Sequence, residues 1–361
     1  MASKTLQDKK VFDFVGKFKI FISISLAVIL IGIIMNIIFG VNLSITFKGG
    51  STITYSYTGD IDTDAVAKTV KEKAELDVTA TPSENYTTGI KNIVLTVTGD
   101  EAISTETQTA VTTALQEVYP DNTLTMTGVT SVAPTIGTSF FLKSLYALLL
   151  ASVLVIIYVG IRFRNIGGVV AALTALAALV HDAAIVYFTD VILRIPLDLN
   201  FIAVVLTILG YSLNDTIVIY DRVRENSKIY GSSITNTELI NLSITQSFKR
   251  SLITSISTFI AIMSIAIVAA VAGLDSILSF AIPMAVGTVA GSFSSICIAG
   301  PLYVKWLDFK DKHNIGKKKS KKKTKYLFKG CTKMQPLFFK TFQFIFKKIA
   351  LHSGNLRKDM L

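Results

Sequence analysis

The chain has 361 residues, of which 51% are hydrophobic and 17% are charged, and its mean hydropathy is +0.55. These values are typical of an integral membrane protein and exclude an ordinary soluble enzyme. The net charge of +11 does not indicate DNA binding, because the residues from Lys305 onward carry +14 and the rest of the chain carries −3.

Six apolar segments are long enough to cross a bilayer as helices, since about 20 residues at ~1.5 Å each span its hydrocarbon core. They lie at about 20–40, 139–161, 166–188, 201–220, 252–272 and 277–304. The first is longer than the apolar part of a signal peptide, and no small-residue cleavage pattern follows it. We therefore expect it to remain as a span.

If all six segments cross the membrane, the Lys and Arg residues that flank them cluster on one side. Short cytoplasmic loops carry an excess of Lys and Arg, so this side is predicted to be the cytoplasmic one. The residues concerned are Lys9, Lys10, Lys17, Lys19, Arg162, Arg164, Arg222, Arg224, Lys249, Arg250 and Lys305. Both termini are therefore predicted to face the cytoplasm. The predicted layout is a cytoplasmic N-terminus (1–19), a first span (20–40), an extracytoplasmic domain (41–138), a five-helix membrane region (139–306) and a basic cytoplasmic tail (307–361).

The extracytoplasmic segment alternates strand and helix patterns. Strands are predicted at 51–58, 92–99 and 122–130 and amphipathic helices at 61–76 and 103–118, with a further strand open in 78–90. The simplest fold that buries both helices on one sheet is a ferredoxin-like α+β sandwich. Gly49 and Gly50 mark the passage from the first span into this domain and predict a tight turn.

Asp215 lies within the apolar run of the fourth span, about 9 Å below its inner end. A carboxylate at a helix centre costs roughly 2.5–3.5 kcal/mol, so such residues usually face an interior and carry function. Tyr211 is four residues earlier and therefore on the same face, and Ser212 and Asn214 add polar groups. The alternative is that Asp215 only forms hydrogen bonds between helices.

Asp182 is a second acid within a span, next to His181 in the third segment, and about 12 Å below the outer end. The two acids are thus predicted at different depths. Carboxylates in apolar surroundings and histidines both exchange protons near neutral pH. For His181 a packing role stays open.

Arg250 opens the fifth span, with Thr254 and Ser255 one turn further on. It fits a positive-inside anchor, but its long side chain also reaches toward a neighbouring span. We therefore predict a switchable pair between Asp215 and Arg250. In the sixth span Gly287 and Gly291 are four residues apart, which suits close helix packing.

No nucleotide-binding loop, nucleophile elbow or metal-ligand spacing is visible in the sequence. We expect no cofactor, and the electrochemical proton gradient is the natural energy source, at ~2.3 kcal/mol per charge per 100 mV. The basic run at 317–325 is expected to be disordered or to lie against anionic lipid, and ribosomal RNA is a further candidate partner of this tail.

Several motifs resemble those of the SecF members of the SecD/SecF family. They are ITFKGGS after the first span, LVHDAAIVYF in the third, GYSLNDTIVIYDRVREN at the end of the fourth, SFKRSLITSIST at the fifth and FAIPMAVGTVAGSFSSICIAGPL in the sixth. The fourth-span motif is the most specific of these, and it includes Gly210, Asp221 and Arg222.

The resemblance implies half of a twelve-helix transporter of the resistance-nodulation-division (RND) superfamily in a bacterial cell membrane. It implies a SecD-like partner, a Sec translocon channel, a translocating polypeptide and use of the proton motive force in late translocation. Asp215 matches the proton-carrying carboxylate of the family, Arg250 matches the arginine of the fifth span, and Asp182 belongs to another family motif.

Two other functions stay open at this point. An RND-type subunit that exports small molecules or lipids would leave a compound in deletion cells without a secretion defect. A non-transporting assembly factor of the export channel would tolerate neutral residues at Asp215 and Arg250.

Overall fold

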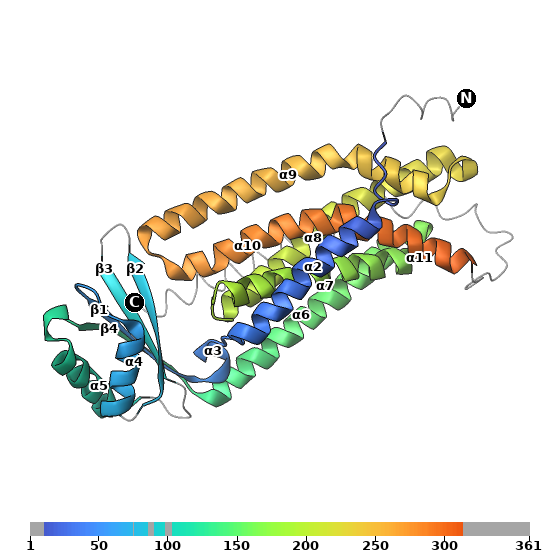
Figure 1. Cartoon of the computed structure of the whole chain (residues 1–361). Coiled ribbons are helices and arrows are strands. Elements are labelled where there is room, and N and C mark those ends of the chain that lie inside the picture. Colours follow the sequence, from blue (N-terminus) through green and yellow to red (C-terminus); the bar gives the residue numbers. More distant parts are fainter. Residues whose placement is uncertain (1–10, 75, 86–89, 98–102, 313–361) are drawn as a thin grey trace, which may run out of the picture. The chain divides into compact units, whose positions relative to one another are not determined.

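The computed structural model describes residues 11–74, 76–85, 90–97 and 103–312, and the described part holds six helices long and apolar enough to cross a membrane (Figure 1). Five are α2 (Phe18–Phe39), α6 (Pro134–Arg162), α7 (Gly168–Ile192), α8 (Leu199–Tyr230) and α9 (Asn236–Ala272). The sixth joins α10 (Asp275–Ser294), the π-helical turn η4 (Ser295–Ala299) and α11 (Gly300–Lys312). The expected polytopic membrane architecture is confirmed. The basic run at 317–325 lies outside the described residues.

Two helices extend well beyond the apolar segments that the sequence marks. Helix α8 continues ten residues past Tyr220, and α9 begins sixteen residues before Leu252. Local capping starts both, because the Asp198 carboxylate accepts the Asn200 and Phe201 N–H groups, and Thr235 forms a capping box with Glu238. Hydropathy detects only the apolar part of a helix, so it misses a continuation with polar residues.

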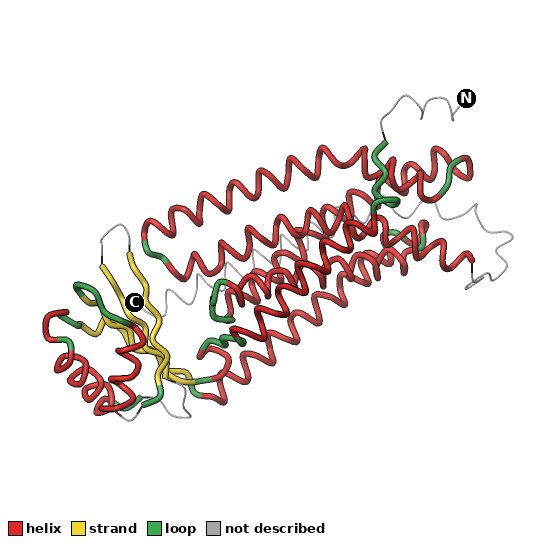
Figure 2. Tube along the Cα trace, viewed as in Figure 1, coloured by secondary structure: helices red, strands yellow, loops and turns green. Residues whose placement is uncertain are grey.

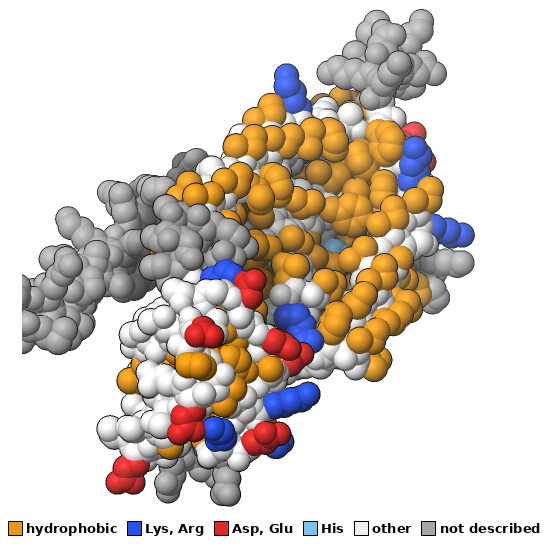
Figure 3. Space-filling view, turned by 60° about the vertical axis from the view of Figure 1, so that its left-hand side comes forward, with side chains coloured by type: hydrophobic (Ala, Val, Ile, Leu, Met, Phe, Trp, Pro, Cys, Tyr) orange, Lys and Arg blue, Asp and Glu red, His pale blue; other side chains and the backbone are white. Residues whose placement is uncertain are grey.

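The six helices divide into a buried group and an exposed group. In α7, α8 and the α10–α11 span, 56%, 50% and 67% of the most apolar stretch is buried, against 11% in α2, 6% in α6 and 17% in α9. The first three therefore form the centre of the bundle. Figure 3 shows hydrophobic side chains over much of the bundle surface and charged side chains on the sheet domain.

The segment between α2 and α6 forms one four-stranded antiparallel sheet with two helices on one face (Figure 2). Its elements are β1 (Gly50–Tyr57), α4 (Thr63–Ala74), β2 (Val78–Asn85), β3 (Ile90–Val97), α5 (Thr105–Val118) and β4 (Thr125–Val132). The strand order β2-β3-β1-β4 is that of the ferredoxin-like fold, as expected. The open question about 78–90 is answered by β2. The last strand begins three residues later than predicted, because Pro120–Asn122 form a 3-10 turn.

The α2–β1 connection and the β4–α6 connection lie against each other. Between α2 and β1 the short helix α3 (Ile45–Lys48) packs on the start of α6, with the Phe47 and Phe141 rings 5.6 Å apart. Gly49 and Gly50 have φ angles of +80° and +124°, and a Cβ at Gly49 would lie 2.6 Å from the Pro134 Cα. Both positions therefore need glycine, as the sequence predicts.

Candidate functional site

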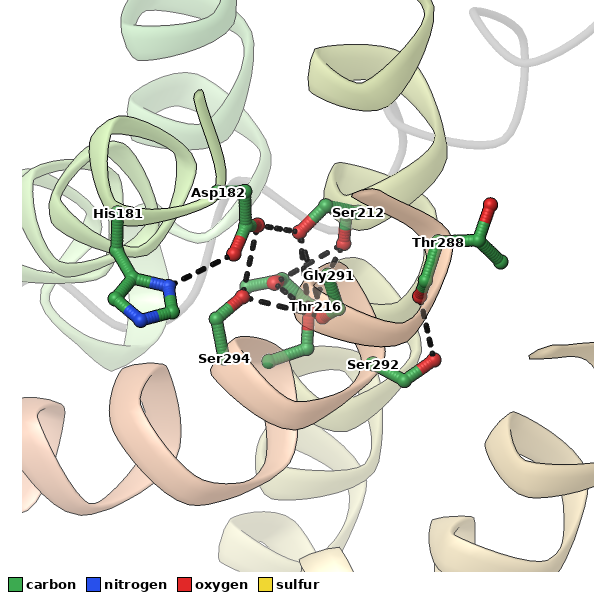
Figure 4. A network of polar contacts seen from close by, with 9 residues as sticks. His181, Asp182, Ser212, Thr216, Thr288, Gly291, Ser292 and Ser294 are labelled. Carbon is green, nitrogen blue, oxygen red and sulfur yellow. Dashed lines mark hydrogen bonds and ion pairs between the residues drawn. The ribbon is translucent and has the colours of Figure 1, made fainter. Parts of the chain in front are cut away.

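Asp182 is the centre of a hydrogen-bonded cluster inside the bundle (Figure 4). It comes from α7 and is fully buried. Its Oδ2 accepts hydrogen bonds from Ser212 Oγ at 2.6 Å and from Ser294 Oγ at 2.8 Å, and its Oδ1 lies 3.1 Å from the Nδ1 of His181. The carboxyl group thus receives one contact from each of the two other central helices, α8 and α10.

The π-helical turn η4 positions the Ser295 hydroxyl beside this cluster. The Ser295 Oγ donates to the Ser212 carbonyl oxygen at 3.1 Å and lies 2.9 Å from the Thr216 Oγ1. Single π-turns widen a helix locally and often occur at functional sites. Here the wider turn lets the consecutive residues Ser294 and Ser295 both face α7 and α8.

Asp215 belongs to a second cluster, which faces α9. The residue is 3% exposed, and its carboxyl group accepts a hydrogen bond from Ser255 Oγ at 3.4 Å. The same Ser255 oxygen accepts from the Tyr211 hydroxyl at 3.1 Å and from the Ser292 hydroxyl. The predicted placement of Tyr211 beside Asp215 is consistent with this geometry, and both side chains meet at Ser255.

The two carboxyl groups lie closer in depth than the sequence suggests. Asp182 is bonded to Ser212, which precedes Asp215 by three residues, or about 4.5 Å along α8. The offset between the two acids is therefore smaller than the ends of the apolar runs suggest, and their depths in the membrane stay a prediction. Ser292 and Ser294 are two residues apart in α10 and so point to different sides of the helix, where each contacts one cluster.

Arg250 does not pair with Asp215 in this structure. The arginine is exposed, and among the described residues no Lys, Arg or His nitrogen lies within ion-pair distance of Asp215. The hydroxyl groups of α9 take that place, since Ser255 binds the carboxylate and Ser251, one turn earlier, is 1% exposed. A switchable Asp215–Arg250 pair stays a prediction about another conformation.

Two of the predicted supporting residues face away from the clusters. Asn214 is exposed on the outer side of α8. The Thr254 hydroxyl donates to the Arg250 and Ser251 carbonyl oxygens of its own helix, at 3.1 and 2.9 Å. The 100° step of an α-helix explains both, because each residue lies next to a buried one and so points elsewhere.

Asp221 and Arg222 form a separate network toward the end of α8. Asp221 lies 2.8 Å from the Arg162 guanidinium of α6 and 2.9 Å from that of Arg224. Arg222 Nε donates to Gln246 Oε1 of α9 at 2.6 Å. These contacts join α8 to α6 and to α9, so their geometry fits a structural role in holding the three helices together.

Gly287 and Gly291 allow α10 to approach α8 closely, as predicted. A Cβ at Gly287 would lie 2.8 Å from the Ile208 Cδ1 and 2.9 Å from the Val186 Cγ2, and one at Gly291 would lie 3.0 Å from the Ser212 Cβ. Gly210 differs, because a Cβ there would meet no described atom within 4 Å outside the neighbouring backbone of its own helix. In this structure Gly210 therefore makes no close contact with another helix that would require glycine.

We expect Gly287→Ala to lower the free energy of unfolding by about 1–3 kcal/mol, because the added methyl group overpacks a tight helix contact. Gly210→Ala is the matched control and should be neutral or stabilising by up to ~1 kcal/mol, since alanine favours helix. Thermal unfolding of the two purified variants in detergent measures this. Equal melting temperatures would show that α10 moves aside at no cost.

The sequence interpretation overlooked several polar groups. Ser292, Ser294 and Ser295 are hydroxyls inside an apolar run, and that feature is the signal that points to them. Asp190 in α7 is 1% exposed, with one carboxylate oxygen that has no partner among the described residues. Near it, burial raises the pKa of the Asp198 carboxyl, while hydrogen bonds from the Phe201 and Asn200 backbone act in the opposite direction.

The chemistry available in these clusters is proton binding. Carboxyl and hydroxyl groups dominate them, and a hydroxyl both donates and accepts hydrogen bonds. A buried carboxyl that gains or loses a proton changes from a donor and acceptor to an acceptor only, so its partners must rearrange. Within the described residues no group of three His, Cys, Asp or Glu side chains has the arrangement of a metal site.

Comparison with known proteins agrees with this architecture. The profile of the family described as protein export membrane protein SecD/SecF, C-terminal, matches residues 110–308. The SecF protein translocase subunit of Alicyclobacillus acidocaldarius is 33% identical over 297 residues, which cover 82% of this chain and 92% of that protein. The SecDF subunit of Bacillus subtilis is 33% identical over 81% of this chain, but this chain spans only 38% of its length.

A solved structure shows the same fold. The crystal structure of SecDF from Thermus thermophilus, described as a translocon-associated membrane protein, superposes with a TM-score of 0.69 at 26% identity. The match covers 83% of this chain and 39% of that protein. This chain therefore spans less than half the length of the two SecDF proteins and nearly all of the SecF protein.

Proposed function

Because this chain belongs to the SecD/SecF family of protein-export membrane proteins, we propose that it is the SecF-type subunit of a bacterial protein translocase. In this role it uses the proton motive force to promote late translocation and release of polypeptides. It is a multi-pass membrane protein and a transport component rather than a classical enzyme. Both of its termini face the cytoplasm in this proposal.

The observation that supports proton coupling is the burial of Asp215 and Asp182 between helices that have different surroundings. Asp215 contacts α9, whose apolar stretch is only 17% buried, whereas Asp182 contacts the central helices α8 and α10. Protonation of Asp215 weakens the hydrogen bond that its carboxylate accepts from the Ser255 hydroxyl, and it removes any electrostatic attraction to Arg250. Helix α9 is then free to shift along α8.

The working cycle requires that the carboxyl groups face the two sides of the membrane alternately. Deprotonated Asp215 attracts Arg250 and brings the two helices together, and protonated Asp215 releases them. Each charge that moves through 100 mV supplies ~2.3 kcal/mol, which is enough to shift a two-state equilibrium about 50-fold.

The junction around α3 passes helix movement to the outer domain. Only Gly49 separates α3 from β1, and only Ala133 separates β4 from α6. The close approach of Gly49 to Pro134 makes the two connections one unit. A tilt of α6 therefore tilts the sheet, which would pull a translocating chain or prevent it from sliding back.

The partners in this proposal are a SecD-type subunit, the Sec channel and the exported chain. This chain matches 38% of the SecDF protein of Bacillus subtilis and 39% of that of Thermus thermophilus, and the name of both joins SecD with SecF, which supports a SecD-type partner. The exposed apolar surfaces of α2, α6 and α9 face lipid or this partner.

The proposed function is tested in cells whose only copy of the gene can be switched off. We expect pulse-labelled secreted protein to be released several-fold more slowly after depletion, and we expect a SecD-type protein to co-purify with the tagged chain in mild detergent. Normal release together with accumulation of a small molecule or lipid would contradict the proposal and favour an exporter.

A further inference from the structure

Strand β4 forms an open edge of the sheet. The sheet order ends at β4, which pairs with β1 on one side and with no strand on the other side in the described part of the chain. Seven of its eight residues are exposed. Its outer edge therefore presents unpaired backbone N–H and C=O groups, which are a template for another strand.

This edge lacks the usual protection against pairing. Strand β4 reads TMTGVTSV, without a charged residue or a proline. The opposite edge strand, β2, contains the exposed Pro82, which has no N–H to donate. A bulge opposite Thr54 and Tyr55 interrupts one part of β4, but from Gly128 to Val132 the register with β1 is regular.

The uncovered face beside this edge is neutral and rich in hydroxyl groups. One row of paired residues crosses the whole sheet and consists of threonines only, namely Thr79, Thr96, Thr52 and Thr130. Permanent interfaces are usually more apolar than this. The short, uncharged edge of β4 is better suited to a contact made through backbone groups. Such a contact tolerates many different side chains on the bound strand.

We propose that the 128–132 part of β4 binds a translocating polypeptide in extended form by strand addition, which rests on the proposed function. Main-chain hydrogen bonds supply the affinity in such contacts, so clients of unrelated sequence fit the same edge. The segment from 40 to 138 carries a net charge of −7, which favours neutral or basic client segments over acidic ones.

The position of this edge links binding to the membrane helices. Val132 is paired with Gly50 and lies two residues before Pro134, the first residue of α6. A chain held on β4 is thus attached next to the junction that moves with α6. Because strand pairing is broken by a change in twist or register, movement of this junction would also release the client.

The test uses a photo-crosslinking residue at Thr130 or at Thr79 in the full-length chain with its partner subunit in membranes. The two sites are exposed threonines of the same row, at opposite edges of the sheet. A secreted protein arrested during translocation is the probe, with either a Lys-containing or a Glu-containing extended segment at the exit. We expect several-fold more client crosslinking from Thr130 than from Thr79, and more with the Lys-containing segment.

A functional comparison accompanies the crosslinking. Thr130→Lys places a charge at the proposed edge and should slow release of a secreted protein several-fold, whereas Thr79→Lys should not. Crosslinks from Thr130 to the SecD-type subunit or to a second copy of this chain, equal client yields from both sites, or no client crosslink would overturn the proposal. Those results would not contradict the proposed function, because depletion of the whole chain tests that function separately.

Discussion

Cells whose only copy carries Asp215→Asn are expected to release a pulse-labelled secreted protein as slowly as cells without the chain. Asparagine keeps the size of the side chain and still accepts the hydrogen bond from Ser255, which is 3.4 Å from the carboxylate. It cannot take up or release a proton. The substitution therefore removes the titration while it preserves the packing.

Two control variants make this experiment specific. Asn214→Ala changes the neighbouring residue, which is exposed on the other side of α8, and should leave release unchanged. Asp215→Glu keeps a titratable group and should restore part of the activity. Membrane abundance and association with the SecD-type subunit are measured for each variant, so that loss of folding is recognised.

Normal release by Asp215→Asn would contradict the proton-coupled mechanism. Asp215 would then be a residue that joins α8 to α9 through Ser255, and the assembly-factor interpretation would take precedence. If release instead stalls, proton flux through the purified complex is the next measurement, and it should be absent in the variant.

Asp182→Ala is expected to lower the free energy of unfolding by about 2–4 kcal/mol. It removes the acceptor of the Ser212 and Ser294 hydroxyls and leaves a small cavity among three central helices. An unsatisfied buried hydroxyl is costly because no water replaces the lost partner. Thermal unfolding of the purified protein in detergent is the measurement.

Asp182→Asn separates the structural role of this residue from proton binding. The amide oxygen still accepts hydrogen bonds, so most of the stability should return, whereas any proton uptake at this position is lost. Asp308→Asn, at an exposed position of α11, serves as the control and should change neither property. A melting temperature of Asp182→Ala equal to that of the natural protein would show that Ser212 and Ser294 find other acceptors, such as the Gly291 carbonyl oxygen.

Much of the fold was accessible to sequence reasoning because strong, local signals specify it. Apolar runs locate all six spans, and period-two and period-3.6 patterns locate most of the sheet domain. The helix ends were less accessible, since α8 and α9 continue in polar sequence that hydropathy does not recognise. Gly49 and Gly50 were recognised from the sequence as a turn, but their contact with α6 was not.

The candidate site was only partly accessible. Asp215, Asp182 and Tyr211 stand out because polar groups are costly within an apolar run. Their hydroxyl partners were mostly missed, because a serine inside a membrane helix often bonds its own backbone and so carries no clear signal. Asn214 and Thr254 were placed in the site by proximity in sequence, although each faces away from it.

Local signals in the sequence are sufficient to predict the class of this protein, its six candidate spans, the ferredoxin-like sheet domain and the identity of the buried acids. Each of these depends on local periodicity or on the cost of a charge in an apolar segment. The packing of the helices is needed to show that Asp182 meets Ser212 and Ser294, that a π-turn positions Ser295, and that Asp215 contacts Ser255 rather than Arg250. These contacts join different helices, and the rotation and register of packed helices depend on side chains distant in sequence, such as those opposite Gly287.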